Sequence, residues 1–205
     1  TNTQNSKYQH NNPPSLTLLY TNFKNFKIMD EHISLNVFMH YNKPMKNIID
    51  YIKEYGNLTL EEYPFNNVDS LSLSQISYIK FENSTIDVES EVHLLNEFEN
   101  EINDLCTNTR VPELNEELFL QTIHSLRYEA ITISHLQTNF DKDNEKQFCA
   151  MTFHLPNQTD YIAFRGTDAS FVGWKEDFNL CFQENIPSQI SALNYVNNYK
   201  TKHKL

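Results

Sequence analysis

The sequence predicts an α/β protein in which helices come first and a partial, incomplete sheet follows. Two patterns predict this order. Over residues 46–127, apolar residues recur every three or four positions, which is typical of helices with one buried face. Over residues 146–155 they alternate with a period of two, and residues 161–164 form a short continuous apolar run, which indicates two strands.

Composition restricts the class of protein. With 205 residues, 39% of them hydrophobic, the chain is long enough for one domain with a sizeable core. A net charge of -11 argues against a nucleic-acid or anionic-membrane surface, because both require clustered Lys or Arg. No run approaches the roughly 20 apolar residues of a membrane span. We therefore expect no nucleic-acid partner and no integral membrane segment.

The cysteines and the N-terminus bear on the compartment. The chain has an odd number of cysteines, widely spaced: Cys106, Cys149 and Cys181. This usage suits buried thiols in a reducing compartment better than a disulfide framework. The first residues also lack the pattern of a secretory signal. A cytoplasmic protein is the expectation.

Residues 1–44 differ from the rest of the chain. They are rich in asparagine, contain Pro13-Pro14 and show no sustained apolar period. We interpret them as a poorly ordered N-terminal tail or extension, with a structured extension as the alternative. The domain proper is expected to span residues 45–205.

Four helices are expected before the strands. The first ends at Gly56 and the second has Asp69 as a plausible cap. The third is acidic and extends from Val92 to Leu105, and the fourth ends near Arg127. Their apolar faces comprise Ile48, Ile49, Ile52 and Tyr55 in the first; Leu71, Leu73, Ile76 and Ile79 in the second; Val92, Leu95, Phe98, Ile102 and Leu105 in the third; and Leu114, Leu118, Ile123 and Leu126 in the fourth.

The strands and the last helices follow. Residues 130–135 are expected to form an edge strand, and residues 146–155 a strand with two unlike faces. Residues 161–164 are expected to be buried on both sides of the sheet. After a glycine loop, residues 174–182 form a short helix or extended arm. Pro187 then starts a helix whose predicted buried side contains Ile190, Leu193 and Val196.

One motif lies between the last strand and the helices that follow it. Phe164-Arg165-Gly166-Thr167, followed by Trp174 and Asp177, resembles the FRG[ST]…W…D segment of class 3 lipases, which are α/β-hydrolases. The longer run GTDASFVGWKEDFN is similar to a bacterial lipase-like α/β-hydrolase family of unknown function. Residues 45–52 and 67–75 also resemble the opening of that family. The resemblance covers about residues 45–199 and is strongest over residues 147–189.

The resemblance implies the N-terminal portion of an α/β-hydrolase fold and a site in this loop. In class 3 lipases the Ser or Thr after Arg-Gly supplies an oxyanion donor, so the resemblance assigns that role to Thr167. The alternative is that Thr167 only caps the following turn. Gly166 and Gly173, two of the three glycines in the chain, bracket the loop.

Arg165, Trp174 and Asp177 are also expected to support the loop. Arg165 is predicted to brace it by pairing with Asp177 or Glu176, and the alternative is a surface arginine without a fixed partner. Trp174 is either a lid over the site or a core residue.

One departure from the family limits the functional prediction. The G-x-S-x-G elbow that carries the nucleophilic serine of such enzymes is absent from the sequence. The resemblance therefore implies a serine esterase or lipase whose catalytic Ser, Asp and His lie beyond Leu205, so that this chain alone is inactive. The full-length parent would act on a small-molecule or lipid ester.

The alternative is a non-catalytic binding or interaction module built on a degenerate hydrolase shell. The eight histidines form no H-E-x-x-H or short-spaced pair, so no metal and no cofactor are expected. His135 and His154, in strand-like segments, are predicted to be structural.

Overall fold

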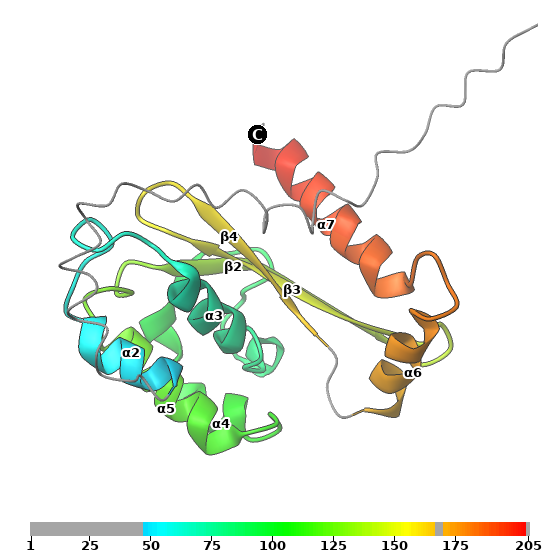
Figure 1. The fold of residues 1–205 in the computed structure, drawn as a ribbon, viewed down its shortest axis with the longest axis horizontal. Helices are drawn as coiled ribbons and strands as arrows, with labels where there is room; N and C mark the ends of the chain where they lie inside the picture. The colour runs from blue at the N-terminus through cyan, green and yellow to red at the C-terminus, as the bar shows by residue number, and fades with distance from the viewer. Residues whose placement is uncertain (1–46, 167–169, 204–205) are drawn as a thin grey trace, which may run out of the picture. The chain divides into compact units, whose positions relative to one another are not determined.

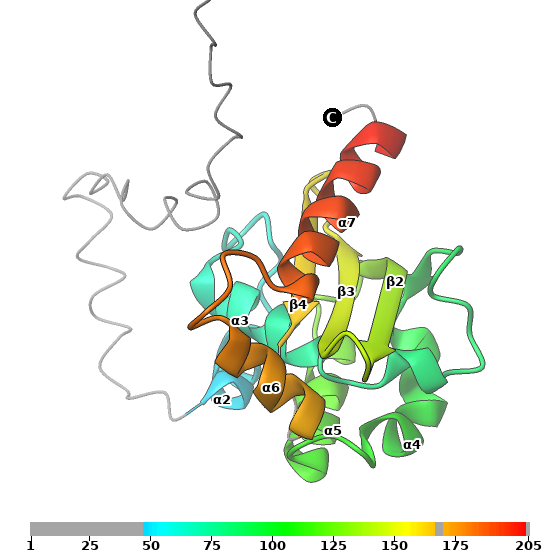
Figure 2. The same ribbon diagram turned by 90° about the vertical axis from the view of Figure 1, so that its right-hand side faces the viewer.

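A four-stranded antiparallel sheet lies between two layers of helices in the computed structural model, which describes residues 47–166 and 170–203 (Figure 1). The contacts of the chain divide it into Thr1–Pro44 and Met45–Leu205, and every element described below belongs to the second unit. Helices α2 to α5 cover one face of the sheet, and α7 lies across the other (Figures 1 and 2). The expected mixture of helices and a sheet is therefore confirmed.

The first predicted helix is confirmed as α2 (Ile48–Tyr55). The side chain of Asn47 caps it by accepting hydrogen bonds from the amides of Ile49 and Asp50. Gly56 follows the helix at an ordinary φ of -60°. A Cβ there would lie 2.4 Å from the carbonyl oxygen of Ile52, so glycine is required by close packing and not by backbone conformation.

The segment predicted as one acidic helix is three elements. It contains β1 (His93–Leu94), the 3-10 helix η4 (Leu95–Glu101) and α4 (Ile102–Cys106). Leu95 and Phe98 are buried as expected, but Val92 is 58% exposed. The prediction of one helix was wrong because His93 and Leu94 pair with β2, a strand that begins only at Thr132.

The other elements of the helical layer are α3 (Asn67–Ile76), the short 3-10 helix η3 (Phe81–Asn83) and α5 (Pro112–Ile123). Their buried side chains join those of α2 and the sheet in one core. Leu114 and Leu126, predicted to be buried, are 52% and 44% exposed. The fourth helix also ends before Arg127, at Ile123, which allows Arg127 to turn into the core.

The sheet has the order β1-β2-β3-β4 and every pairing is antiparallel. Its longer strands are β2 (Thr132–Asp141), β3 (Lys146–His154) and β4 (Asp160–Arg165). Among the described residues, β4 is an edge strand, and Phe164 on it is 39% exposed. The expectation of a last strand buried on both sides was therefore wrong, and so was the edge position expected for β2.

The two faces of β3 are unlike, as the alternation predicts. Met151 and Phe153 belong to the large core beneath α2 to α5. Phe148 and Ala150 belong to a smaller cluster with Tyr195 of α7 (Pro187–His203). The helix begins at Pro187 as predicted, but its predicted buried side is wrong.

The buried face of α7 contains two tyrosines. Ile190 and Leu193 are 51% and 53% exposed, whereas Tyr195 and Tyr199 are buried against the sheet. The Tyr195 hydroxyl contacts Thr152 Oγ1 at 2.9 Å and donates to the carbonyl of His135 at 2.8 Å. A tyrosine hydroxyl can satisfy these strand groups and an aliphatic side chain cannot, which explains the choice of face.

Two of the three cysteines are buried, Cys106 and Cys149, and burial raises the pKa of each thiol to about 11. Cys181 is exposed, so the expectation of a buried thiol was wrong there. Within the described ranges, no helix combines the length and apolar character needed to cross a bilayer.

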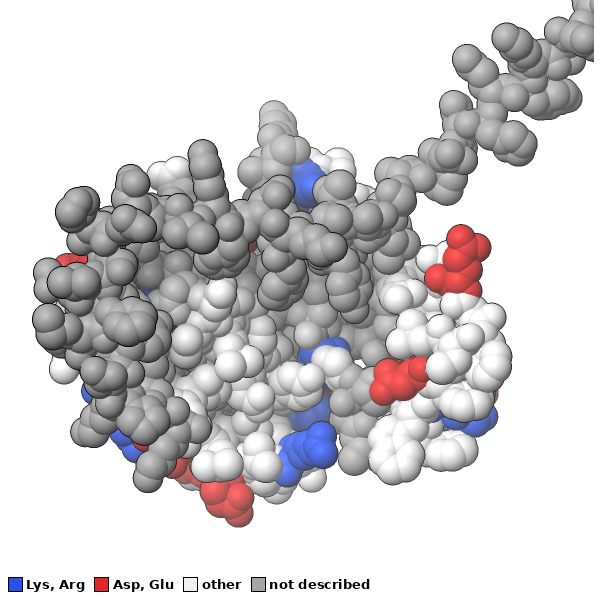
Figure 3. Space-filling view, viewed as in Figure 1, with Lys and Arg blue, Asp and Glu red and all other residues white. Residues whose placement is uncertain are grey.

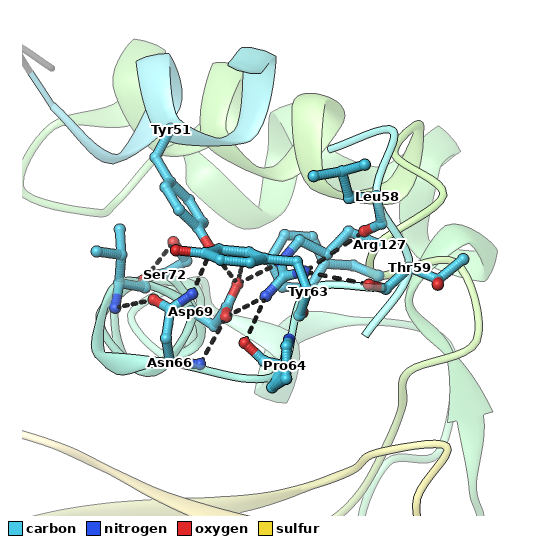
Figure 4. A network of polar contacts seen from close by, with 11 residues as sticks. Tyr51, Leu58, Thr59, Tyr63, Pro64, Asn66, Asp69, Ser72 and Arg127 are labelled. Carbon is cyan, nitrogen blue, oxygen red and sulfur yellow. Dashed lines mark hydrogen bonds and ion pairs between the residues drawn. The ribbon is translucent and has the colours of Figure 1, made fainter. Parts of the chain in front are cut away.

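The helical layer contains an ion pair without solvent exposure, between Asp69 and Arg127 (Figure 4). Nη2 of Arg127 lies 2.5 Å from Oδ2 of Asp69, and Nε lies 2.7 Å from Oδ1. Tyr51 and Tyr128 donate their hydroxyls to Oδ1, and burial raises the pKa of both phenols, so they stay protonated donors. The backbone N–H of Asn66 donates to Oδ2 of Asp69 at 2.8 Å. Asp69 thus completes the capping box of α3 and neutralises Arg127.

The guanidinium also organises the chain that precedes α3. Nη1 of Arg127 donates to the carbonyl of Tyr63 at 2.7 Å, and Nη2 donates to that of Pro64 at 3.3 Å. The ring of Tyr63 lies 5.2 Å from the guanidinium carbon. One buried pair therefore joins α2, the segment before α3, α3 itself and the turn that leads into β2.

Arg127→Met should destabilise the protein by about 3–5 kcal/mol, because it leaves the Asp69 carboxylate buried without its cation. Urea unfolding monitored by circular dichroism measures the change. Arg110→Met, at an exposed arginine, is the control and should change stability by less than about 0.5 kcal/mol. A loss below about 1 kcal/mol for Arg127→Met would show that the pair does not support the fold.

Candidate functional site

The segment between β4 and α6 (Phe171–Asn179) carries the residues singled out by the sequence. Arg165, the last residue of β4, forms a two-pronged ion pair with Glu82 of η3, with nitrogen–oxygen distances of 2.6 and 3.2 Å. Its Nη1 also donates to the carbonyl of Ile79 at 3.4 Å. Arg165 therefore pairs with Glu82 and not with the predicted Asp177 or Glu176, and its role as a brace for the loop stays a prediction.

The two carboxylates expected to pair with Arg165 have other positions. Asp177 is exposed on α6, and Glu176 is buried and bonded elsewhere. Alternation along β4 turns Arg165 toward the helical layer, as it does Tyr161 and Ala163. Glu82 is 83 residues earlier in the chain, so no local pattern indicates the pair.

The start of the loop forms a hydrogen bond with a residue of the helical layer. The amide of Gly166 donates to the hydroxyl of Tyr78 at 3.2 Å. A Cβ on Gly166 would lie 3.0 Å from that hydroxyl, so a larger residue there would require the Tyr78 side chain to shift slightly. Thr167, the predicted oxyanion donor, lies outside the described residues.

The far end of the loop is fixed by the start of α6. Ser170 is the N-cap, and its Oγ accepts a hydrogen bond from the amide of Gly173 at 3.1 Å. The same hydroxyl donates to the side chain of Gln147 on β3 at 3.4 Å. The backbone amides of the first turn of α6 lie at a helix N-terminus, where the helix dipole favours negative charge.

Glu176, which the sequence analysis considered only as a partner of Arg165, joins three elements. It is 3% exposed. Its carboxylate accepts hydrogen bonds from the backbone N–H of Gln147 on β3 and from the backbone N–H and hydroxyl of Ser188 on α7, each at 2.8 Å. In the sequence it stands among other charged residues, and nothing distinguishes it from a surface carboxylate.

Trp174 is 64% exposed and therefore is not a core residue. Its neighbours on α6 and in the following turn are also exposed, from 48% for Leu180 to 74% for Phe182. Phe171 and Phe178 are between these values, at 73% and 66%. In Figure 3, which has the view of Figure 1, residues other than Lys, Arg, Asp and Glu predominate at the right, where α6 lies. We call these five side chains the α6 apolar surface.

Two cavities share Arg165 as a lining residue. One, of about 310 Å³, also contacts Gly166, Glu82 and Gln147. The other, of about 270 Å³, contacts Tyr78 and residues of the helical layer. Lys80 lines both, so each cavity has a lysine beside the Arg165–Glu82 pair. The described residues include no group of three His, Cys, Asp or Glu side chains placed to hold a metal ion.

His135 and His154 belong to one hydrogen-bonded cluster with Ser134 and Asp160. Sequence reasoning treated them as separate structural histidines. They come from different strands, and only the pairing of β2, β3 and β4 brings them together.

The Arg165–Glu82 pair should have a coupling free energy of about 1–2 kcal/mol, because its charge-assisted hydrogen bonds are mostly shielded from water. A double-mutant cycle with Glu82→Gln and Arg165→Met, measured by urea unfolding, tests this. The exposed pair Lys53–Glu117 is the control and should couple by less than about 0.5 kcal/mol. Equal coupling in the two cycles would mean that Arg165 is not a brace.

Glu176→Ala should release α6 and the start of α7 from β3, because three donors lose their acceptor. We expect a loss of about 2–4 kcal/mol and faster amide hydrogen exchange in residues 171–190. Glu184→Ala, at an exposed carboxylate between α6 and α7, is the control. If both variants exchange alike, Glu176 does not join these elements.

The chain is similar to one family model, described as Mbeg1-like, over residues 122–205. The matched residues include β2 to β4, the loop after β4, α6 and α7. No curated protein and no solved structure matches the chain.

Proposed function

We propose that the chain is the N-terminal part of a serine carboxylic-ester hydrolase and contributes the oxyanion loop. The observation that carries the proposal is the loop after β4, whose two ends are held by side chains. Glu82 and Tyr78 hold Arg165 and Gly166 at its start, and Ser170 caps α6 at its end.

Fixed ends are what an oxyanion site requires. Hydrogen-bond donors stabilise a tetrahedral intermediate only if they are already oriented when the charge develops. The amide and hydroxyl of Thr167 are the proposed donors, and the first turn of α6 adds a favourable dipole. The resemblance of Phe164-Arg165-Gly166-Thr167 to the class 3 lipase motif supports this role.

The nucleophile is proposed to lie outside residues 1–205, because the sequence contains no G-x-S-x-G elbow. Residues 1–205 would then be inactive in this reaction without the catalytic Ser, Asp and His. The substrate class is a small-molecule or lipid ester, and the reaction requires no cofactor. We place the protein in the cytoplasm.

A second candidate function is a non-catalytic interaction module, and the α6 apolar surface favours it. Five large apolar side chains lie within residues 171–182, each about half exposed or more. Contiguous exposed apolar surface of this kind marks sites of interaction in soluble proteins. Among the described residues β4 is also an edge strand, and unpaired strand edges accept partners.

A fluorophosphonate probe on the protein expressed from its complete gene tests the hydrolase. We expect one serine outside residues 1–205 to be labelled. Thr167→Val should slow labelling by about 100- to 1,000-fold, the usual effect of losing an oxyanion donor. Thr107→Val removes a hydroxyl that bonds only within its own helical turn, and should have no effect.

The outcomes separate the two candidates. A folded protein of natural length that takes no label, together with a sedimentation coefficient that falls on Trp174→Ser, would favour the interaction module. Labelling that is unaffected by Thr167→Val would mean that this loop is not the oxyanion site.

A further inference from the structure

Three side chains on neighbouring strands stand in the order of a serine hydrolase relay. Oγ of Ser134 on β2 lies 2.7 Å from Nε2 of His154 on β3. Nδ1 of the same imidazole lies 2.7 Å from Oδ1 of Asp160 on β4. Asp160 is directly opposite His154 in the sheet, and Ser134 is opposite Thr152, two residues away on the same face.

The protons of this cluster have a consistent arrangement. A carboxylate accepts only, so Nδ1 of His154 carries the proton toward Asp160. In a neutral His154 ring Nε2 is then an acceptor and can take the hydroxyl proton of Ser134, an arrangement in which Nδ1 of His135 donates to the same Oγ. This is the tautomer in which a histidine acts as base toward a serine. Tyr199 of α7 donates to the second carboxylate oxygen at 2.6 Å, which orients Asp160.

A cavity lies beside the serine, with His135 between them. Ser134 is 1% exposed. Nδ1 of His135 lies 2.5 Å from Ser134 Oγ, and His135 also lines a cavity of about 220 Å³ together with Tyr195 and Tyr199. The register of β2 shifts at this point, and His135 has a φ of 54°, a region that favours glycine. Bulges and strained residues of this kind occur often beside functional sites.

We propose that Ser134, His154 and Asp160 form a second acyl-transfer site, with Ser134 as nucleophile and the His135 ring as a gate between it and the cavity. The site is distinct from the loop of the proposed function. Asp160 and Arg165 are the two ends of β4, which puts them about 17 Å apart at the usual rise per residue. The volume of the cavity suits esters with short acyl groups.

The reaction balances with an ester and water alone. Ser134 Oγ forms a bond to the acyl carbon, its proton passes to Nε2 of His154, and the ester C–O bond breaks. The departing alkoxide takes that proton from His154. Water then attacks the acyl-serine, gives a proton to His154 and releases the acid, after which Oγ recovers its proton. With a fluorophosphonate the P–F bond breaks instead, fluoride leaves and the adduct remains.

His135→Gly in the full 205-residue chain tests the site. Glycine accepts the φ of 54° without strain, and the change both opens the cavity to Oγ and removes the hydrogen bond from His135. We expect a short-chain fluorophosphonate to label Ser134 faster than in the wild type, because the probe can then reach Oγ. Mass spectrometry of the labelled peptide identifies the residue.

Further variants decide whether the relay activates the serine. In the His135→Gly chain, Ser134→Ala should abolish the label and His154→Gln should slow it by about 100-fold or more, the usual contribution of a general base. Gln158→Gly, at another residue with positive φ, is the control and should leave the labelling of Ser134 at its wild-type rate. Should His135→Gly not fold, His135→Asn, which tolerates positive φ and is smaller, replaces it.

Two results would overturn the proposal. One is a folded His135→Gly protein, as judged by near-ultraviolet circular dichroism, in which Ser134 takes no label. The other is labelling of Ser134 that persists unchanged with His154→Gln. In both cases the cluster only anchors α7 to the sheet. The outcome is independent of Thr167 and of any serine outside residues 1–205, so it does not depend on the proposed function.

Discussion

The buried pair of Asp69 and Arg127 is the interaction on which the rest of the fold depends. Removing two charges from water costs several kcal/mol for each ion, and only close pairing with further hydrogen bonds offsets that cost. In this protein the carboxylate accepts from two phenols and one backbone amide besides the guanidinium. The guanidinium donates to the backbone carbonyls of Leu58, Thr59, Tyr63 and Pro64. The pair also fixes the turn that leads into β2, so the sheet depends on it for its position on the helical layer.

Other carboxylates in this acidic chain also hold helices and strands together, each at one contact between elements. Glu82 holds the end of β4 through Arg165, Glu176 joins α6 and α7 to β3, and Asp160 receives Tyr199 from α7. Each of these carboxylates accepts a hydrogen bond from another helix or strand. Part of the negative charge of this protein is therefore structural.

The sequence indicated the loop after β4 and left its support unidentified. The end of a strand at Arg165 and Gly166 can be predicted from the apolar run that stops there. The partners of these residues, Glu82 and Tyr78, are more than 80 residues earlier in the chain. Ser134, His154 and Asp160 come from three different strands, and no local pattern distinguishes them. Their contacts depend on the register of the sheet, because a shift of one residue would turn a side chain to the opposite face.

By itself the sequence determined the local elements: α2 and its end at Gly56, the two unlike faces of β3, and the start of α7 at Pro187. These depend on periodicity, capping and backbone restriction within a few residues. Only the tertiary structure decided that β4 is an edge strand among the described residues, that tyrosines and not Ile190 and Leu193 face the sheet from α7, and that Arg165 pairs with Glu82. The reason is that pairing, burial and ion-pair choice depend on distant segments, and local patterns carry no information about which segments meet.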